Sequence, residues 1–365
     1  MRYLMAGGGT GGHIIPAINI AREILKIDTN AQFLFIGTER GMETKIVPNA
    51  GFELKMVEAK PWNGISSLKN LIASSSFVAQ IIDDFRCDAV VGTGGYVSAP
   101  AIVAAKKRKI PLFIQEQNTF PGLATKLGSL FAKKVFLGFE QAKRFLWRKS
   151  RAIFSGNPAN ITIPNRDRET VRREFGLSPN YRTILITGGS QGASALNETM
   201  KILLERSGLP ANTQVLWQCG NRGFPALDSW LAGKNFPVVL KPFIDNMALA
   251  YLSADIVIAR SGALTLAEIA IAKLPAILIP YPHSAGNHQL KNAAVFADAG
   301  AAVVIEQKDL TPALLLSSIE EIITNPARME EMSKSAWSLA KPDAGKMIAR
   351  EIVEALENER INSLK

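Results

Sequence analysis

The sequence predicts an α/β protein built from two Rossmann-like domains with parallel sheets. Three observations lead to this class. Short apolar runs alternate with helix-like segments along the whole chain, glycine-rich turns follow three of those runs, and the strand-helix pattern restarts after Pro164. Fully apolar strands that alternate with helices are typical of parallel sheets covered on both faces. A chain of 365 residues also fits two such domains better than one.

The predicted elements fall into two sets. In the first set the strands are residues 2–6, 32–37, 87–92, 111–114, 133–138 and 152–154, with helices that include 14–26 and 68–84. In the second set the strands are residues 182–187, 213–218, 236–240, 255–259, 276–280 and 301–305, and a long helix covers 343–360. The segment 155–165 between the sets is rich in turn-forming residues, so we place the domain boundary there.

The three glycine-rich turns, Gly7–His13, Gly92–Tyr96 and Gly188–Gly192, each lie between a predicted strand and a predicted helix. Glycine allows close approach of a ligand to the backbone, and a helix start offers unpaired N–H groups and the positive end of the helix dipole. The turns therefore predict phosphate or pyrophosphate binding. His13 stands at the first helix start, where the dipole disfavours its protonated form. It is our candidate general base, with simple helix capping as the alternative.

The third turn has a second interpretation, because it also reads G-x-S-x-G, the nucleophile elbow of α/β-hydrolases. Asp255 and His283 follow Ser190 in the order of a hydrolase triad. A serine hydrolase is therefore an alternative from another reaction class. In the first interpretation, Ser190 and the backbone N–H groups of the turn hold a phosphate instead.

Three further segments follow predicted strands and carry polar groups. Arg260–Glu268 places an arginine beside a helix start made of small residues, which predicts an anion site, and Glu268 is placed to accept hydrogen bonds from a ribose diol. The polar loop at 283–289 follows a strand end, where α/β proteins bind ligands. Asn118 is a candidate sugar or acceptor contact, with an Asx turn as the alternative.

The positive charge is confined to one half of the chain. The net charge is +10, and residues 1–160 hold 21 basic and 11 acidic residues, whereas the rest of the chain is balanced. Such a field attracts nucleic acid, anionic lipid or acidic substrates. Nucleic acid would leave the glycine turns without a purpose, so we expect no nucleic-acid partner. The alternative is an ordinary solvated surface.

Composition and motif content exclude other classes. Two distant cysteines predict a reduced, cytoplasmic protein, and Met1 leads directly into a strand, so we expect no signal peptide. No apolar stretch is long enough to span a bilayer. The histidines lack clustered cysteines or carboxylates, and there is no D-x-D and no P-loop motif. We therefore predict no zinc site, no metal-held diphosphate, no P-loop ATPase and no cofactor.

These motifs, in this order, resemble the MurG family of UDP-N-acetylglucosamine transferases, which convert lipid I to lipid II in peptidoglycan synthesis. The resemblance covers nearly the whole chain. The matching segments are Gly8–His13, Gly92–Pro100, Glu116–Asn118, Gly156–Pro158, Gly188–Ala193, Phe243–Met247, Arg260–Thr265 with Glu268, and His288–Gln289 with Asn292.

The resemblance implies a GT-B fold: two Rossmann-like domains that face an inter-domain cleft. Residues 1–160 would form an acceptor and membrane-docking domain, with a helix at 342–365 packing back on it, and residues 161–341 would bind UDP-N-acetylglucosamine. The implied reaction is inverting: the C4 hydroxyl of the muramyl sugar attacks C1 of N-acetylglucosamine, and UDP leaves. A UDP-sugar 2-epimerase shares this architecture but would not need a basic, membrane-seeking half, and it stays an alternative.

Site residues follow from the resemblance position by position. The implied contacts are Thr10, Gly11, Gly12, Asn118, Ser190, Ile244, Arg260, Ala263, Leu264, Thr265, Leu266, Ala267, Glu268 and Gln289. A further contact falls on position 160, where the family usually has an arginine and this sequence has Asn160.

The resemblance also implies the partners: UDP-N-acetylglucosamine, lipid I, an anionic membrane surface and other cell-wall synthesis proteins. The protein would be peripheral, on the cytoplasmic face of the cell membrane. Basic residues around exposed apolar ones in the first domain would dock it there. The candidates are Leu68, Leu71, Ile72, Phe77 and Trp147, flanked by Lys69, Lys133, Lys134, Arg144, Arg148 and Lys149.

Overall fold

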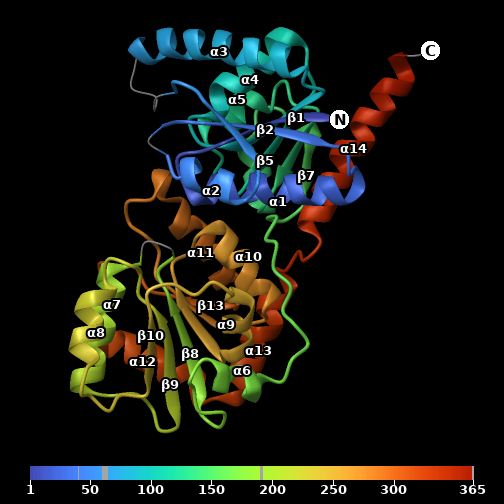
Figure 1. The fold of residues 1–365 in the computed structure, drawn as a ribbon. Helices are drawn as coiled ribbons and strands as arrows, with labels where there is room; N and C mark the ends of the chain where they lie inside the picture. Colours follow the sequence, from blue (N-terminus) through green and yellow to red (C-terminus); the bar gives the residue numbers. More distant parts are fainter. Residues whose placement is uncertain (40, 60–64, 190–191, 364–365) are drawn as a thin grey trace. The chain divides into compact units, whose positions relative to one another are not determined.

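The computed structural model describes residues 1–39, 41–59, 65–189 and 192–363, and the side chains of 65–68 and 363 lie outside that description. The chain forms two compact units (Figure 1). Unit 1 comprises Met1–Asn160 and Lys341–Lys365, and unit 2 comprises Ile161–Ala340. Each contains a parallel sheet with helices between its strands. The predicted class, two Rossmann-like parallel-sheet domains, is therefore confirmed.

The sheet of unit 1 has the strand order β3-β2-β1-β4-β5-β6-β7. Its strands are β1 (Arg2–Gly7), β2 (Gln32–Gly37), β3 (Glu53–Met56), β4 (Ala89–Gly94), β5 (Leu112–Glu116), β6 (Lys134–Leu137) and β7 (Ala152–Phe154). Its helices are α1 (Gly11–Ile27), α2 (Glu43–Asn49), α3 (Ile65–Phe85), α4 (Ser98–Arg108), α5 (Leu123–Gly128) and α14 (Ala344–Ser363), with the 3₁₀ helices η1 (Glu140–Phe145) and η2 (Lys149–Arg151).

Alternate side chains of each strand enter two separate cores, because successive residues of a strand point to opposite faces. Leu4 of β1 packs in the core that contains α3 and α4, whereas Tyr3 and Met5 pack in the core that contains α1, α2 and α14 (Figure 1). The C-terminal helix thus belongs to unit 1, where Ile348 and Ile352 are fully buried. The strands read as continuous apolar runs because both faces of the sheet are covered.

The sheet of unit 2 has the order β10-β9-β8-β11-β12-β13. Its strands are β8 (Arg182–Thr187), β9 (Thr213–Gln218), β10 (Val238–Lys241), β11 (Ile256–Ala259), β12 (Ala276–Leu278) and β13 (Ala302–Val304). Its helices are α6 (Arg168–Glu174), α7 (Ser194–Arg206), α8 (Phe224–Leu231), α9 (Met247–Ser253), α10 (Ala263–Ile271), α11 (His288–Asp298), α12 (Pro312–Ile323) and α13 (Pro326–Ser338), with the 3₁₀ helix η3 (Ala285–Asn287).

In both sheets the strand order reverses in the middle, between β1 and β4 in unit 1 and between β8 and β11 in unit 2. Ligands of open α/β sheets bind at such switch points, beyond the carboxyl ends of the strands. All three glycine-rich turns follow one of these four strands. The topology therefore places each turn at the carboxyl ends of the strands of its own sheet, where ligands are expected to bind.

One strand of unit 1 was missed by the sequence analysis. Strand β3 lies at the sheet edge and pairs only with β2, and its residues are mostly exposed. Its sequence, Glu53-Leu54-Lys55-Met56, alternates polar and apolar residues. A search for fully apolar runs overlooks such a half-solvated edge strand.

Candidate active site

The first two glycine turns pack against each other at the switch point of unit 1. A Cβ atom at Gly7 would collide with Thr93 Oγ1, and one at Gly95 would collide with the carbonyl oxygen of Gly8. Gly11, by contrast, has no heavy atom within 4 Å of a Cβ built on it, and its φ is not positive. The backbone alone therefore does not require glycine at the start of α1. The open space there suits a ligand that approaches the first N–H groups of the helix.

His13 lies in the first turn of α1, and two acceptors fix its ring. Its Nδ1 atom lies 2.9 Å from Gln117 Oε1 and 3.1 Å from the carbonyl oxygen of Thr93. Both partners are acceptors in this orientation, because the Gln117 amide nitrogen donates to Thr93 O at 2.7 Å and to the backbone oxygen of Gln115 at 3.2 Å. The network therefore assigns the proton to Nδ1 and leaves the lone pair on Nε2.

A second layer of amides holds Gln117. The Asn157 side chain donates to the carbonyl oxygen of Gln117 at 3.0 Å and accepts from the side chain of Gln115 at 3.1 Å. Gln115, Gln117 and Asn157 are all buried. The segments Glu116–Asn118 and Gly156–Pro158 thus meet in space through Gln117 and Asn157, and both support the ring of His13. The sequence contains both motifs, but their link to the histidine is made only by the fold, because Gln117 lies 104 residues from His13.

The other predicted residues of unit 1 lie at its surface. Thr10 and Gly12 are exposed at the start of α1. Asn118 is partly exposed and follows Gln117 directly, and its backbone N–H donates to Glu116 Oε1 at 3.1 Å. Asn160 is exposed at the last position of this segment of unit 1.

The third glycine turn, in unit 2, is braced by a glutamine. The Gln218 side chain donates to Thr187 Oγ1 at 3.1 Å and to the carbonyl oxygen of Gly189 at 3.3 Å, while its Oε1 accepts the backbone N–H of Ile244 at 2.9 Å. Ile244 is buried, and its backbone is thereby tied to the glycine turn. Ser190 falls outside the described residues.

Helix α10 carries the predicted ribose carboxylate. Gly262 caps the helix in an extended conformation, and Leu264, Thr265 and Ala267 are partly exposed whereas Ala263 and Leu266 are buried. Burial raises the pKa of Glu268 to about 7, although a hydrogen bond from the Tyr251 hydroxyl to Glu268 Oε2, 2.9 Å long, lowers it. Tyr251 is fully buried, which holds its own pKa well above the usual value. It therefore stays a neutral donor that orients the carboxylate.

Arg260 and Gln289 support the loop that follows β12. Arg260 donates to the carbonyl oxygens of Ile279 and Pro280 at 3.0 and 3.2 Å and to Gln307 Oε1 at 2.6 Å, and burial lowers its pKa. Gln289 Oε1 accepts the backbone N–H of Tyr281 at 2.9 Å. The side-chain amide nitrogen of Gln289 therefore points away from Tyr281 and can donate to another group. Arg260 thus braces the loop beside α10.

The geometry does not support the hydrolase alternative. Asp255 precedes β11, whereas the glycine turn follows β8, and these two strands are parallel with Ile256 opposite Ile184. The aspartate and the described part of the glycine turn therefore lie at opposite ends of these two strands. Asp255 is buried in ion pairs with Arg172 at 2.6 Å and Arg168 at 3.0 Å, so it is a structural anion.

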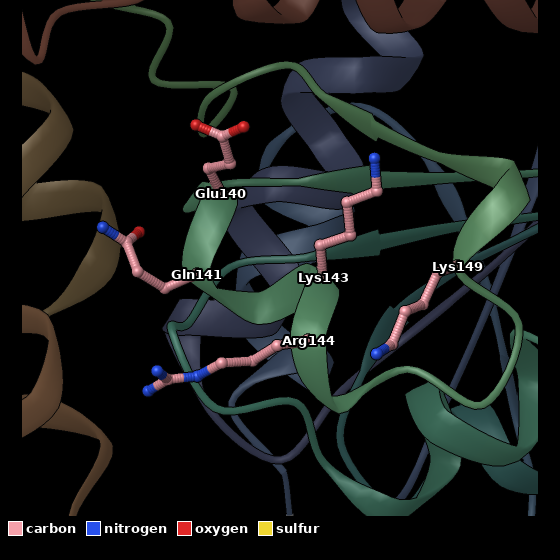
Figure 2. Close-up of a pocket in the computed structure, with 5 residues that line it drawn as sticks. All are labelled: Glu140, Gln141, Lys143, Arg144 and Lys149. Atoms are coloured by element: carbon pink, nitrogen blue, oxygen red, sulfur yellow. The ribbon is translucent and has the colours of Figure 1, made fainter.

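The basic residues of unit 1 divide into two groups. Lys133 pairs with Glu359 and Lys134 with Glu351, both on α14, so these two docking candidates also attach the C-terminal helix. Arg144 and Lys149, in contrast, line an open hollow of about 460 Å³ with Glu140, Gln141 and Lys143 (Figure 2). Trp147, which stands between Arg144 and Lys149 in the sequence, is 54% exposed.

The apolar docking candidates of α3 also differ among themselves. Ile72 is 60% and Phe77 44% exposed, whereas Leu71 is only partly so. The side chain of Leu68 is outside the described part. No helix among the described residues is long and apolar enough to cross a membrane. The described residues also contain no group of three or more His, Cys, Asp or Glu placed to hold a metal ion.

Comparison with known proteins agrees with this geometry. The N-terminal domain model of glycosyltransferase family 28 matches residues 3–137, and the C-terminal domain model matches residues 183–348. A curated protein of Bacillus cytotoxicus is 39% identical over 94% of this chain and 96% of its own length, and one of Halalkalibacterium halodurans is 36% identical over 97% and 100%. Both are named UDP-N-acetylglucosamine–N-acetylmuramyl-(pentapeptide) pyrophosphoryl-undecaprenol N-acetylglucosamine transferase.

The chain belongs to the MurG family of glycosyltransferases. The crystal structure of Acinetobacter baumannii MurG superposes with a TM-score of 0.79 at 28% identity and covers 97% of this chain and 99% of its own. A UDP-N-acetylglucosamine 2-epimerase from Listeria monocytogenes reaches a TM-score of 0.68 at 14% identity, over 98% and 96%. This second likeness reflects the shared GT-B fold alone, so sequence identity along the full chain separates the MurG family from the epimerases.

Proposed function

We propose that this protein transfers N-acetylglucosamine from UDP-N-acetylglucosamine to the C4 hydroxyl of the muramyl sugar of lipid I, giving lipid II with inversion at the anomeric carbon. The observation that carries the proposal is identity along the full chain with the MurG family. The two switch-point sites agree with it: unit 1 carries an oriented histidine, and unit 2 carries the carboxylate of Glu268 on α10.

In this mechanism His13 is the general base. A single in-line displacement needs a group that removes the proton of the attacking hydroxyl. Because Nδ1 faces two oxygen acceptors, Nε2 holds the lone pair that takes this proton. The positive charge that then develops on the ring lies against Gln117 Oε1 and Thr93 O, and both oxygens stabilise it. The open backbone at Thr10–Gly12 beside the histidine contacts the sugar of the donor.

The donor nucleotide binds mainly to unit 2 in this proposal. Glu268 accepts the ribose hydroxyls, Ile244 contacts the base, and Gln289 offers its amide nitrogen to the ligand. The diphosphate lies at the starts of α7 and α10, where the first backbone N–H groups and the helix dipole stabilise the charge that grows on the leaving UDP. Arg260 adds positive charge beside the start of α10 and keeps its loop in place.

Product analysis tests the proposal. The protein is incubated with UDP-N-acetylglucosamine labelled in the sugar, with and without a lipid I analogue, and the products are separated. We expect labelled disaccharide only when the acceptor is present. Free N-acetylglucosamine alone would indicate a hydrolase and would contradict the proposal. UDP-N-acetylmannosamine in the absence of acceptor would indicate a 2-epimerase.

Peripheral docking on an anionic bilayer completes the proposal, and it is assigned to unit 1. Trp147 supplies an exposed apolar group. Arg144 and Lys149, which flank it in the sequence, line the hollow (Figure 2). Each basic residue near an anionic bilayer contributes about 1 kcal/mol, and salt screens that attraction.

The docking test reverses Arg144, Arg148 and Lys149 to glutamate and measures sedimentation with vesicles of phosphatidylglycerol and phosphatidylcholine. Lys133 and Lys134 are left intact because they attach α14. We expect binding to fall strongly at low salt while UDP binding persists. The control reverses the exposed residues Arg173, Lys308 and Lys334 of unit 2, which should retain vesicle binding. Equal losses in both variants would assign the effect to net charge and would contradict docking through unit 1.

A further inference from the structure

Glu43 is a fully buried carboxylate that the proposed mechanism does not use. It is the first residue of α2, and three donors from two loops converge on it. Its Oε2 accepts the backbone N–H of Gly9 at 3.0 Å. Its Oε1 accepts the backbone N–H and the hydroxyl of Thr38 at 2.8 and 3.1 Å. The carboxylate thus joins the first glycine turn to the loop after β2.

The chain is shaped around this side chain. A Cβ at Gly8 would lie 2.8 Å from Glu43 Oε1, and Cβ atoms at Gly37 and Gly41 would collide with Glu43 Cγ and Oε2. Three positions, at the end of β2 and in the two loops, therefore need glycine for the carboxylate to fit. This steric requirement is independent of the hydrogen bonds, and it shows that the Glu43 side chain fills a defined space next to the first turn.

Glu43 also reaches the second glycine turn, through Thr38. The Thr38 hydroxyl gives its hydrogen to the carboxylate, so the Tyr96 hydroxyl, 3.3 Å away, is the donor to Thr38 Oγ1. Gly9, at φ +87°, lies against the Tyr96 ring, since a Cβ there would lie 3.0 Å from Tyr96 Cε1. Glu43, Thr38 and Tyr96 form a continuous chain across the switch point, from one turn to the other.

We propose that Glu43 is a positioning residue for sugar transfer. It fixes the first turn, and through Thr38 the second, so that His13 keeps its place toward the acceptor. The inference rests on the proposed function. A carboxylate is suited to this position because both of its oxygens only accept hydrogen bonds. Glutamine has the same shape but must turn its amide N–H groups toward the N–H of Gly9 or of Thr38.

The test compares Glu43→Gln with Glu23→Gln, a control at another buried carboxylate of unit 1, which pairs with Lys26 at 2.6 Å. The acceptor KM, kcat and the calorimetric Kd for UDP are measured for each. We expect Glu43→Gln to lower kcat/KM for a lipid I analogue by about 10- to 100-fold, the range for losing hydrogen bonds to a charged group, with a raised acceptor KM. The Kd for UDP should change by less than about twofold, because unit 2 holds the nucleotide.

A lower kcat at unchanged acceptor KM would indicate only a smaller folded fraction and would overturn the positioning role. Unchanged kinetics would overturn it as well. Thr38→Val is the second variant, which serves if Glu43→Gln does not fold: it keeps the Thr38 backbone N–H on Glu43 but breaks the link to Tyr96. It should raise the acceptor KM by a smaller factor, and an unaltered KM would contradict the proposal. A wild-type protein that transfers no sugar would contradict the proposed function instead.

Discussion

The turns after β1 and β8 occupy the same topological position in their units, yet different chemistry holds them. In unit 1 a carboxylate, Glu43, accepts from the backbone of Gly9. In unit 2 an amide, Gln218, donates to the backbone of Gly189 and accepts from that of Ile244. A carboxylate gathers N–H groups, whereas an amide joins a carbonyl of one loop to an N–H of the next. The same backbone feature, a glycine turn between a strand and a helix, thus occurs in both units, and the side chains around each turn determine the chemistry of its site.

The ionisable groups beside the turns differ in the same way. Unit 1 has a histidine whose ring is fixed by oxygen acceptors, and unit 2 has a glutamate whose pKa burial raises to about 7. The proposed function places proton removal in unit 1 and nucleotide binding in unit 2. Substitutions whose effects on kcat and on UDP affinity are measured separately test whether the two units have these different roles.

His13→Ala should have the largest effect. Removing a general base lowers the rate by about 10²- to 10⁴-fold. We expect kcat for transfer to fall within that range while the calorimetric Kd for UDP stays the same. His283→Ala is the matched control, since the hydrolase alternative gave the catalytic role to that residue. A normal kcat for His13→Ala, or parallel losses of kcat and UDP affinity, would remove the base role.

Glu268→Ala should weaken UDP binding by about 10- to 100-fold, the loss expected for hydrogen bonds to a charged group. The effect should be much smaller for 2′-deoxy-UDP, because the carboxylate is assigned to the ribose diol. Titration calorimetry of both nucleotides measures the difference. Glu320→Ala, at an exposed glutamate of α12, is the control. An equal loss for the two nucleotides would place Glu268 away from the ribose.

Tyr251→Phe should have the smallest effect, visible mainly as a shift in pH dependence. Ionised Glu268 is the form that accepts ribose hydroxyls, so UDP affinity should rise with pH through about 7. The Tyr251 hydrogen bond lowers the pKa of Glu268, and its loss should move the midpoint to higher pH. Affinity should converge with the wild type well above that midpoint. An unshifted profile, as expected for the control Tyr181→Phe, would mean that Tyr251 does not tune the carboxylate.

The sequence predicted the two sheets because buried parallel strands are recorded locally, as continuous apolar runs bounded by turns. It missed β3, whose alternating residues reflect a half-solvated edge. The glycine turns and the helix starts were equally readable, since each lies within a few consecutive residues.

The side-chain contacts that support the two sites could not be predicted from the sequence. Gln117 lies 104 residues from His13, and Glu43 lies 34 residues from Gly9. The sequence names Lys134 as a docking candidate, and it does not show that this lysine also pairs with Glu351, which stands 217 residues away. Partners this distant are joined only by the fold, and a local pattern does not specify which polar side chain meets which.

The stereochemistry of transfer tests the central claim most directly, because a single displacement assisted by a base inverts the anomeric carbon. The measurement is the anomeric proton coupling of the N-acetylglucosamine unit in the disaccharide made from UDP-α-N-acetylglucosamine and a lipid I analogue. The account predicts a β-1,4 linkage from wild-type protein. An α linkage would require a covalent or front-face mechanism, and it would contradict the role given to His13.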